Sequence, residues 1–140
     1  MRFYDLIPRS LLSIVKTIWL FGRRRYCPVC CRHSRKFLES GVITRPNARC
    51  AWCGALERHR LVWRYFQERT DLFDGSPKSL LHVAPEACMR PRLEALLPGH
   101  LGVDLSSADE TERMDITDIP HPDDSFDVIY CSHVFEHIPD

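Results

Sequence analysis

Four cysteines stand in two pairs whose spacing suits a metal ion. Two residues separate the cysteines within each pair, and 19 residues separate Cys30 of the first pair from Cys50 of the second. Each pair can place two thiolates on one side of a tight turn, and two such turns can build a tetrahedral four-sulfur site. Soft thiolates in a tetrahedron favour zinc, and four protein ligands leave no position open for chemistry. The sequence therefore predicts a structural zinc ion bound by Cys27, Cys30, Cys50 and Cys53.

The other three of the seven cysteines have simpler interpretations. Cys31 is a spare donor beside the first pair, as is His33, and either could replace a ligand. For Cys88 and Cys131 we expect the usual behaviour of a free cysteine, that of a small buried hydrophobe. Cysteine pairs at metal spacing indicate a reducing compartment rather than disulfides. We expect a cytoplasmic protein, also because Arg23 and its neighbours, not a small-residue cleavage site, follow the first apolar run.

Two acids follow apolar segments at points where a nucleotide needs them. Asp104 ends a predicted strand over 101–104, and Asp115 lies in a short predicted strand over 113–116. In a doubly wound sheet the first turn meets the ligand with its backbone, and an acid after the second strand accepts hydrogen bonds from a ribose. Asp115 is placed to offer a carboxylate to an adenine amine. An acid at a strand end is often only a turn residue, but the two together favour an adenosine-type ligand.

The last segment joins a predicted strand over 126–131 to a polar, helix-initiating stretch. Ser132, His133 and His137 lie in that stretch. In an open α/β sheet such a junction lies at the carboxyl end of a strand, where ligands bind. Histidine changes charge near neutral pH, so His133 and His137 are the candidate general bases. His82, within the first predicted strand, is more simply a hydrogen-bonded core histidine.

The elements that must position these residues alternate along the second half of the chain. After the break at 75–77, the pattern predicts strands over 80–84, 101–104, 113–116 and 126–131, with a helix over 92–97. Strands that alternate with helices imply crossover connections and a parallel sheet. The predicted fold class is therefore α/β, a partial doubly wound (Rossmann-like) parallel sheet preceded by a small zinc-ribbon-like module and helices.

Four regions follow from this division. We expect an N-terminal amphipathic helix within 1–24, a zinc-ribbon-like module over 25–56, a linking helix within 57–74, and the sheet domain over 75–140. The first helix, over 10–21, carries an apolar stripe with basic residues nearby. It either packs on the rest of the protein or lies on a membrane surface as a peripheral contact.

The net charge of zero hides two opposite halves. Residues 1–70 hold 15 Lys and Arg against 4 Asp and Glu, whereas residues 71–140 hold 4 against 15. The basic half suits phosphate, nucleic acid or an anionic membrane surface. The simpler alternative is that the two halves attract each other.

Residues 25–140 resemble a known enzyme family. Three stretches resemble the third and fourth motif regions of class I S-adenosylmethionine-dependent methyltransferases of the broad small-molecule group, namely MDITDIP (114–120), DDSFDVI (123–129) and VFEHIPD (134–140). Three earlier stretches resemble bacterial methyltransferases that carry a zinc-ribbon-like segment before the catalytic domain, namely CPVC (27–30), LERHRL (56–61) and LHVAPE (81–86). The resemblance implies S-adenosylmethionine as cofactor beside the zinc ion. It also implies that the chain is the first half of the catalytic domain, so we expect it to bind cofactor poorly and to be inactive alone.

The resemblance assigns a role to each matching position. Ala84, Pro85 and Glu86 would meet the methionine end of the cofactor, Asp104 would hold the ribose, and Asp115 and Ile116 would frame the adenine; Ser132 and His133 would lie beside the sulfonium and the acceptor. The chain departs from the family in its first turn, where glycines usually let the backbone touch the cofactor. Side chains narrow the approach here, and Pro85 removes a donor, although Glu86 could take the cofactor's ammonium group.

Three functions compete at this stage. The leading one is methyl transfer to a small-molecule or saccharide-type acceptor. The second is a zinc-containing RNA methyltransferase, because the basic half also holds Trp52, Trp63 and Tyr65, which suit base stacking. The third is a non-catalytic binding or scaffold module, which the glycine-free turn favours. The sequence does not predict an oligomeric state.

Overall fold

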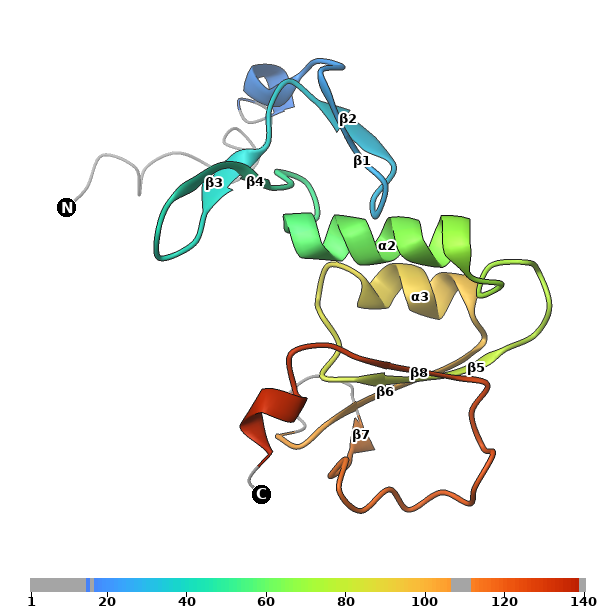
Figure 1. Ribbon diagram of the computed structural model, residues 1–140. Helices are drawn as coiled ribbons and strands as arrows, with labels where there is room; N and C mark the ends of the chain where they lie inside the picture. The colour runs from blue at the N-terminus through green and yellow to red at the C-terminus, as the bar shows by residue number, and fades with distance from the viewer. Residues whose placement is uncertain (1–14, 16, 107–111, 139–140) are drawn as a thin grey trace. The chain divides into compact units, whose positions relative to one another are not determined.

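The protein is described here by a computed structural model that covers residues 15, 17–106 and 112–138. The chain divides into two compact units, Met1–Leu61 and Val62–Asp140 (Figure 1). The division falls inside helix α2 (Glu57–Arg69), which the sequence predicted as a link between modules. It therefore lies earlier in the chain than the break at Gly75. Each unit is described separately below.

The first unit is built from two short hairpins. Strands β1 (Arg25–Cys27) and β2 (Arg32–Ser34) pair antiparallel, as do β3 (Leu38–Ser40) and β4 (Arg45–Arg49). Of the helix predicted over 10–21, residues 15 and 17–20 are helical, and most of the remainder lies outside the described residues. Few large apolar side chains are buried in this unit, so hydrophobic burial alone stabilises it weakly.

One arginine joins the second hairpin of this unit to the start of α2. The Arg60 Nη1 atom donates to the carbonyl oxygens of Ala48 at 2.9 Å and of Ala55 at 2.7 Å. The Arg60 guanidinium also lies 4.2 Å from the centre of the Phe37 ring. Hydrogen bonding with the backbone and a cation–π contact thus replace part of the missing apolar core.

The second unit contains a four-stranded parallel sheet in the order β7-β6-β5-β8. Its strands are β5 (Ser79–Val83), β6 (Gly99–Asp104), β7 (Glu112–Arg113) and β8 (Val128–Cys131). Helix α3 (Arg90–Leu96) connects β5 to β6, and a 3-10 turn, η2 (Phe135–His137), follows β8. The predicted α/β class with a parallel sheet is confirmed.

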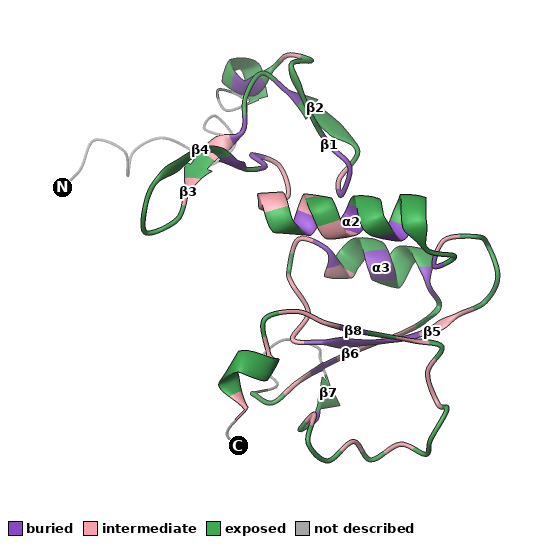
Figure 2. Ribbon diagram, viewed as in Figure 1, coloured by how far each residue is buried: buried purple, intermediate pink, exposed green. Residues whose placement is uncertain are grey.

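Alternation along β5 sends side chains to both faces of the sheet. Leu80 and His82 lie on one face, where the Phe66 ring of α2 meets the Tyr130 ring at 5.2 Å and His82 lies 5.0 Å from the same Tyr130 ring. Figure 1 places α3 over this face as well. Leu81 and Val83 face the other way, into a core with Val103 and Met114. Burial on both faces explains why the β5 sequence is a continuous apolar run (Figure 2).

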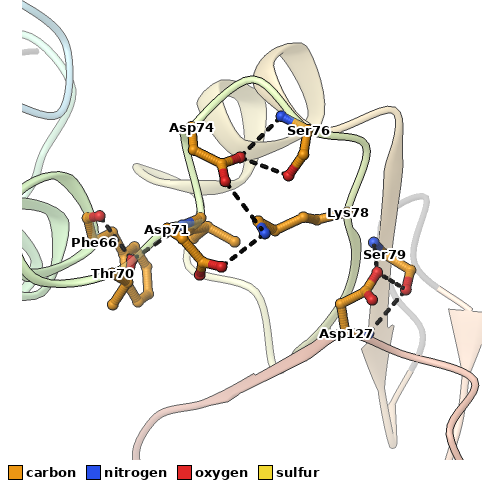
Figure 3. Close-up of polar contacts among 9 residues, drawn as sticks. Phe66, Thr70, Asp71, Asp74, Ser76, Lys78, Ser79 and Asp127 are labelled. Carbon is orange, nitrogen blue, oxygen red and sulfur yellow. Dashed lines mark hydrogen bonds and ion pairs between the residues drawn. The ribbon is translucent and has the colours of Figure 1, made fainter.

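Polar contacts fix where strands β5 and β8 begin (Figure 3). The Asp127 carboxylate accepts hydrogen bonds from the Ser79 backbone N–H at 2.7 Å and from the Ser79 hydroxyl at 2.8 Å. Just before this pair, the Lys78 ammonium lies 2.9 Å from Asp71 and 3.7 Å from Asp74. These contacts hold the start of β8 beside the start of β5, so the carboxyl ends of both strands reach the same edge of the sheet.

Candidate functional site

The four predicted zinc ligands come together in the first unit. The sulfur atoms of Cys27 and Cys53 are 3.7 Å apart, those of Cys30 and Cys50 are 3.8 Å apart, and all four lie within 4.8 Å of one another. A tetrahedral zinc ion with Zn–S distances of about 2.3 Å requires sulfur atoms about 3.8 Å apart. Among the described residues this is the one cluster with metal-binding geometry, and neither Cys31 nor His33 belongs to it.

The two cysteine turns have the same backbone design. Gly54 follows the second pair with a φ of +80°, and Cys31 follows the first pair with a φ of +54°. A left-handed residue at this point lets the chain turn away after the second thiol. The Trp52 backbone N–H points back at the Cys50 sulfur from 3.4 Å. Glycine accepts this conformation without strain, whereas cysteine adopts it at a cost.

The electrostatics of the cluster favour a cation. Burial and the neighbouring thiolates of Cys27 and Cys50 raise the pKa of Cys30 to about 12. Hydrogen bonds from the Cys27 and Cys53 thiols lower the pKa of Cys50. The cluster alone therefore prefers to carry few negative charges, and a divalent cation would be needed to hold four thiolates together. The donor set and its geometry fit zinc. A zinc ion would hold the two hairpins together, and its four thiolate ligands would leave no open coordination position.

The second unit holds a cavity of about 540 Å³ at the carboxyl ends of its strands. The chain runs outward from β5 through β6 to β7 and then returns to place β8 on the other side of β5. The cavity is at this reversal of strand order, where open α/β sheets bind ligands. Its volume lies in the range of small-molecule sites. Its lining comes from the last residues of β5 and β6 and from the segments after all four strands: Val83, Ala84, Asp104, Leu105, Met114, Asp115, Ile116, Thr117, His133, Val134, His137 and Ile138.

The two predicted acids both line this cavity, and they share a local geometry. Asp104 Oδ1 accepts hydrogen bonds from the Ser106 backbone N–H at 2.8 Å and hydroxyl at 2.7 Å. Asp115 Oδ1 accepts in the same way from Thr117, at 2.9 and 2.7 Å. The hydrogen bonds from Thr117 lower the pKa of Asp115, so this carboxylate is ionised. Within the described part of the chain, neither Oδ2 atom has a hydrogen-bond partner, which leaves one acceptor on each acid for a ligand.

The turn after β5 has a glycine-like backbone although it contains no glycine. Ala84 has a φ of +49°, and its N–H donates to the Val103 carbonyl oxygen at 2.8 Å. A left-handed alanine is strained by about 1–2 kcal/mol. Ala84 lines the cavity and carries only a methyl group, so the backbone of this turn lies close to the cavity.

One face of the cavity comes from the segment after β8. His133 has a φ of +58°, and its Nδ1 atom lies 3.1 Å from Glu136 Oε1. A backbone hydrogen bond and the contact with His133 lower the pKa of Glu136. His137 lines the same cavity, whereas Ser132 does not. Both candidate bases thus line the same cavity as the two acids. The acids come from the β6 and β7 side of β5, and the bases follow β8 on the opposite side.

Comparison with known families agrees with this geometry. Residues 81–140 match a family model described as a methyltransferase domain. This part of the chain, 60 of its 140 residues, is therefore similar to class I methyltransferase domains. No curated protein and no solved structure matches the chain. A methyltransferase domain implies use of S-adenosylmethionine. The cavity of this domain lies at the carboxyl ends of its strands.

Glu86 occupies a different place in the methyltransferase domain from the one that the resemblance implied. Its Oε2 atom lies 3.0 Å from His82 Nε2, and its Oε1 atom accepts a hydrogen bond from the Tyr130 hydroxyl at 2.9 Å. Glu86 and Pro85 do not line the cavity. The expectation that Glu86 is available to a cofactor's ammonium group is therefore not supported, because both of its oxygens already have partners inside the protein.

The network continues on the face of the sheet that α3 covers (Figure 1). His82 is fully buried, as predicted, and its Nδ1 atom lies 3.1 Å from His100 Nε2. Burial alone would raise the pKa of Glu86, but hydrogen bonds from His82 and Tyr130 outweigh burial and lower it. With Glu86 ionised, His82 Nε2 donates to its carboxylate, and the Nδ1 atom of the same ring pairs with His100 Nε2. Three strands thereby hold the turn at Ala84.

Sequence reasoning missed His100 and Tyr130 as partners of this turn. Both lie on strands that pair with β5 in register, since Leu80 lies opposite His100 and His82 opposite Tyr130. The available signal was a polar side chain in each of three apolar strands. Buried polar side chains usually form hydrogen bonds, so polar residues on neighbouring buried strands are expected to contact one another.

No helix among the described residues is both long enough and apolar enough to cross a membrane.

Proposed function

We propose that the cavity of the methyltransferase domain binds S-adenosylmethionine and that the protein transfers its methyl group to a small-molecule or saccharide-type acceptor. The observation that carries this proposal is the placement of Asp104 and Asp115 in one cavity, each with one carboxylate oxygen directed to no described partner. When bound, the cofactor supplies an electrophilic methyl group.

The residues of the cavity fit the parts of this ligand. The Asp104 carboxylate would accept hydrogen bonds from the ribose hydroxyls, and Asp115 would accept from the adenine amine, beside the apolar side chain of Ile116. The strained turn at Ala84 would bring backbone to the methionine end. Glu86, Pro85 and Ser132 would act through the shape of the turn or the strand end rather than by touching the ligand.

His133 is the better placed of the two candidate bases. Because its Nδ1 atom faces the ionised Glu136, Nδ1 carries the proton and Nε2 remains able to accept one. His133 Nε2 would take the proton of an acceptor hydroxyl as the nucleophile forms. Direct displacement depends mainly on alignment, so this contribution is secondary to positioning.

The charge around the cavity favours a neutral or cationic acceptor over RNA. Residues 71–140 hold 15 acidic side chains against 4 basic ones. Asp118, Asp123 and Asp124 are exposed on the segments that follow the cavity's acids. A polyanion would be repelled here, although the basic first unit keeps RNA methylation as the alternative.

A titration with S-adenosylhomocysteine, followed by amide resonances of the complete chain, tests the proposal. This method detects binding even at millimolar dissociation constants, so weak affinity does not hide the result. We expect shifts confined to the turn at Ala84 and to the neighbourhoods of Asp104 and Asp115. Asp104→Asn should weaken binding by about 10- to 100-fold, the equivalent of one hydrogen bond to a charged group.

Asp118→Asn is the matched control, because Asp118 is exposed and does not line the cavity. It should leave binding unchanged. An absence of shifts at millimolar ligand, with the fold intact, would favour the non-catalytic scaffold instead. Equal losses in the Asp104 and Asp118 variants would remove the assigned role of Asp104.

A further inference from the structure

The helical residues at the start of the first unit expose the face that a core helix would bury. Val15, Ile18 and Trp19 lie on one helical face by their i, i+3, i+4 spacing, and they are 56, 70 and 53% exposed. Phe21, directly after the helix, is 81% exposed. Leu20 alone turns inward, with 1% exposure. The apolar stripe of Val15, Ile18 and Trp19 therefore does not pack the helix against the first unit.

Backbone and cation–π contacts hold this exposed face beside a cluster of cations. The Arg35 N–H donates to the Leu20 carbonyl oxygen at 2.8 Å, and Gly22 packs so closely on Arg35 that a Cβ atom would lie 3.1 Å from its Cα. The Lys36 ammonium lies 4.0 Å from the centre of the Trp19 ring. Arg23, Arg24 and Arg25 follow immediately and are exposed. Exposed apolar and basic side chains thus follow one another along this segment, and Lys36 contacts the apolar stripe directly.

The described part of this unit holds few acids that could neutralise this cluster. Residues 15–61 hold Glu39 and Glu57 as their only acidic side chains, against eleven Lys and Arg. Of the two, Glu57 already lies 3.5 Å from Arg45. The positive charge of the surface is consequently available to an anionic partner.

We infer that this surface, formed by Val15, Ile18, Trp19 and Phe21 with Arg23, Arg24 and Lys36, docks the protein on an anionic lipid membrane. Aliphatic and aromatic side chains would enter the boundary between headgroups and acyl chains, and the arginines would contact the lipid phosphates and carboxylates. Either signal alone binds a membrane weakly, but the two together give stable attachment.

The aliphatic residues decide between lipid and nucleic acid. Single-stranded nucleic acids bind to aromatic rings and cations, on which bases stack and phosphates pair. Val15 and Ile18 offer neither ring nor charge, so a nucleic-acid surface would have no use for them. A membrane interface takes aliphatic and aromatic side chains alike, which fits the whole stripe.

Cosedimentation of the complete zinc-loaded chain with lipid vesicles tests this inference. We expect binding to vesicles of phosphatidylcholine with phosphatidylserine, and at least tenfold weaker binding to phosphatidylcholine alone. Arg23→Gln with Arg24→Gln should weaken binding by about 30-fold, since each cation near an anionic surface contributes about 1 kcal/mol. Ile18→Ser with Phe21→Ser should weaken binding by at least about 100-fold, from the loss of two inserted side chains.

Val42→Ser with Ile43→Ser is the matched control. These two residues are also fully or largely exposed, at the tip of the hairpin between β3 and β4, away from the proposed surface in sequence. Their replacement should leave vesicle binding unchanged. Zinc content and circular dichroism of every variant show whether the first unit remains folded.

Three results would overturn the inference. One is equal binding to neutral and anionic vesicles by all variants. Another is binding of single-stranded RNA, with no vesicle binding, that survives Ile18→Ser with Phe21→Ser. The third is a concentration-dependent dimer that the same double substitution abolishes while vesicle binding is absent, because the stripe would then cover a second copy of the chain.

Discussion

The hydrogen bond from Tyr130 to Glu86 gives the sharpest test of the structure beneath the candidate cavity. Tyr130→Phe removes a hydroxyl that lies 2.9 Å from a buried carboxylate oxygen. The ring contacts with Phe66 and His82 remain, since phenylalanine keeps the ring. A hydrogen bond to a charged group contributes about 1.5–3 kcal/mol. We therefore expect the free energy of unfolding of the second unit to fall by that amount at pH 7.

Urea unfolding followed by tryptophan fluorescence measures this loss. Trp63 is 1% exposed and belongs to the second unit, so a background with Trp19→Phe and Trp52→Phe leaves one tryptophan that reports on this unit. Tyr65→Phe is the control, because Tyr65 is more than half exposed on α2. The control should change stability by less than about 0.5 kcal/mol.

The pairing itself is tested by a double-mutant cycle with Glu86→Ala. A coupling of about 1–2 kcal/mol between Tyr130→Phe and Glu86→Ala is expected if the two groups interact directly. The pKa of Glu86 is lowered in the folded state, so its contribution is complete above the unfolded pKa of about 4.3 and is lost as pH falls through the lower folded value. The effect of Tyr130→Phe should then be the same at pH 7 and pH 5. A coupling near zero, or a loss below about 0.5 kcal/mol, would refute the network as described.

Three further predictions concern the metal cluster, the first turn and the buried histidine pair. Cys27→Ser should unfold the first unit, and elemental analysis should no longer find stoichiometric zinc. Cys31→Gly should retain zinc, because Cys31 is outside the cluster and its left-handed backbone suits glycine. Ala84→Val should lower the stability of the second unit by about 1–2 kcal/mol in urea unfolding, and Ala84→Gly should be neutral or stabilising by up to about 1 kcal/mol; a tolerated valine would contradict the left-handed turn. Burial and the neighbouring His82 lower the pKa of His100, so its contribution is complete above the unfolded pKa of about 6.5 and is lost as pH falls through the lower folded value. The midpoint urea concentration should therefore decrease less below pH 6.5 in His100→Gln than in the unchanged protein. An unchanged pH profile would remove His100 from the network.

Local patterns predicted most of the sheet. The apolar run at β5 and the acid that closes β6 were both recognisable, because burial on two faces demands continuous apolar residues. The predicted ends of the strands were less accurate than their existence. The predicted strand over 126–131 begins at Val128, because Asp127 is held by Ser79 from a distant part of the chain. The predicted strand over 113–116 ends at Arg113, because Asp115 forms a turn with Thr117.

The candidate site was predicted unevenly for the same physical reason. Cysteine spacing is a local signal, so the four ligands were recognisable without knowledge of the fold. The role of Glu86 was not, since its partner Tyr130 lies 44 residues away and reaches it only through the pairing of β8 with β5. The conformation of Ala84 could not be predicted from its residue type, because alanine is rarely left-handed; the signal that remained was the family resemblance, in which glycines stand in this turn.

The matching turns at Cys31 and Gly54 have a consequence for the order in which the first unit assembles. Each turn brings its own pair of thiols together across only two intervening residues, so either pair can capture an ion before the hairpins meet. The remaining step closes a loop of about 20 residues, whose entropic cost grows only slowly with length. Insertions between β2 and β3 or at the β3–β4 tip should accordingly slow maturation little, while a single residue added within either pair should block it.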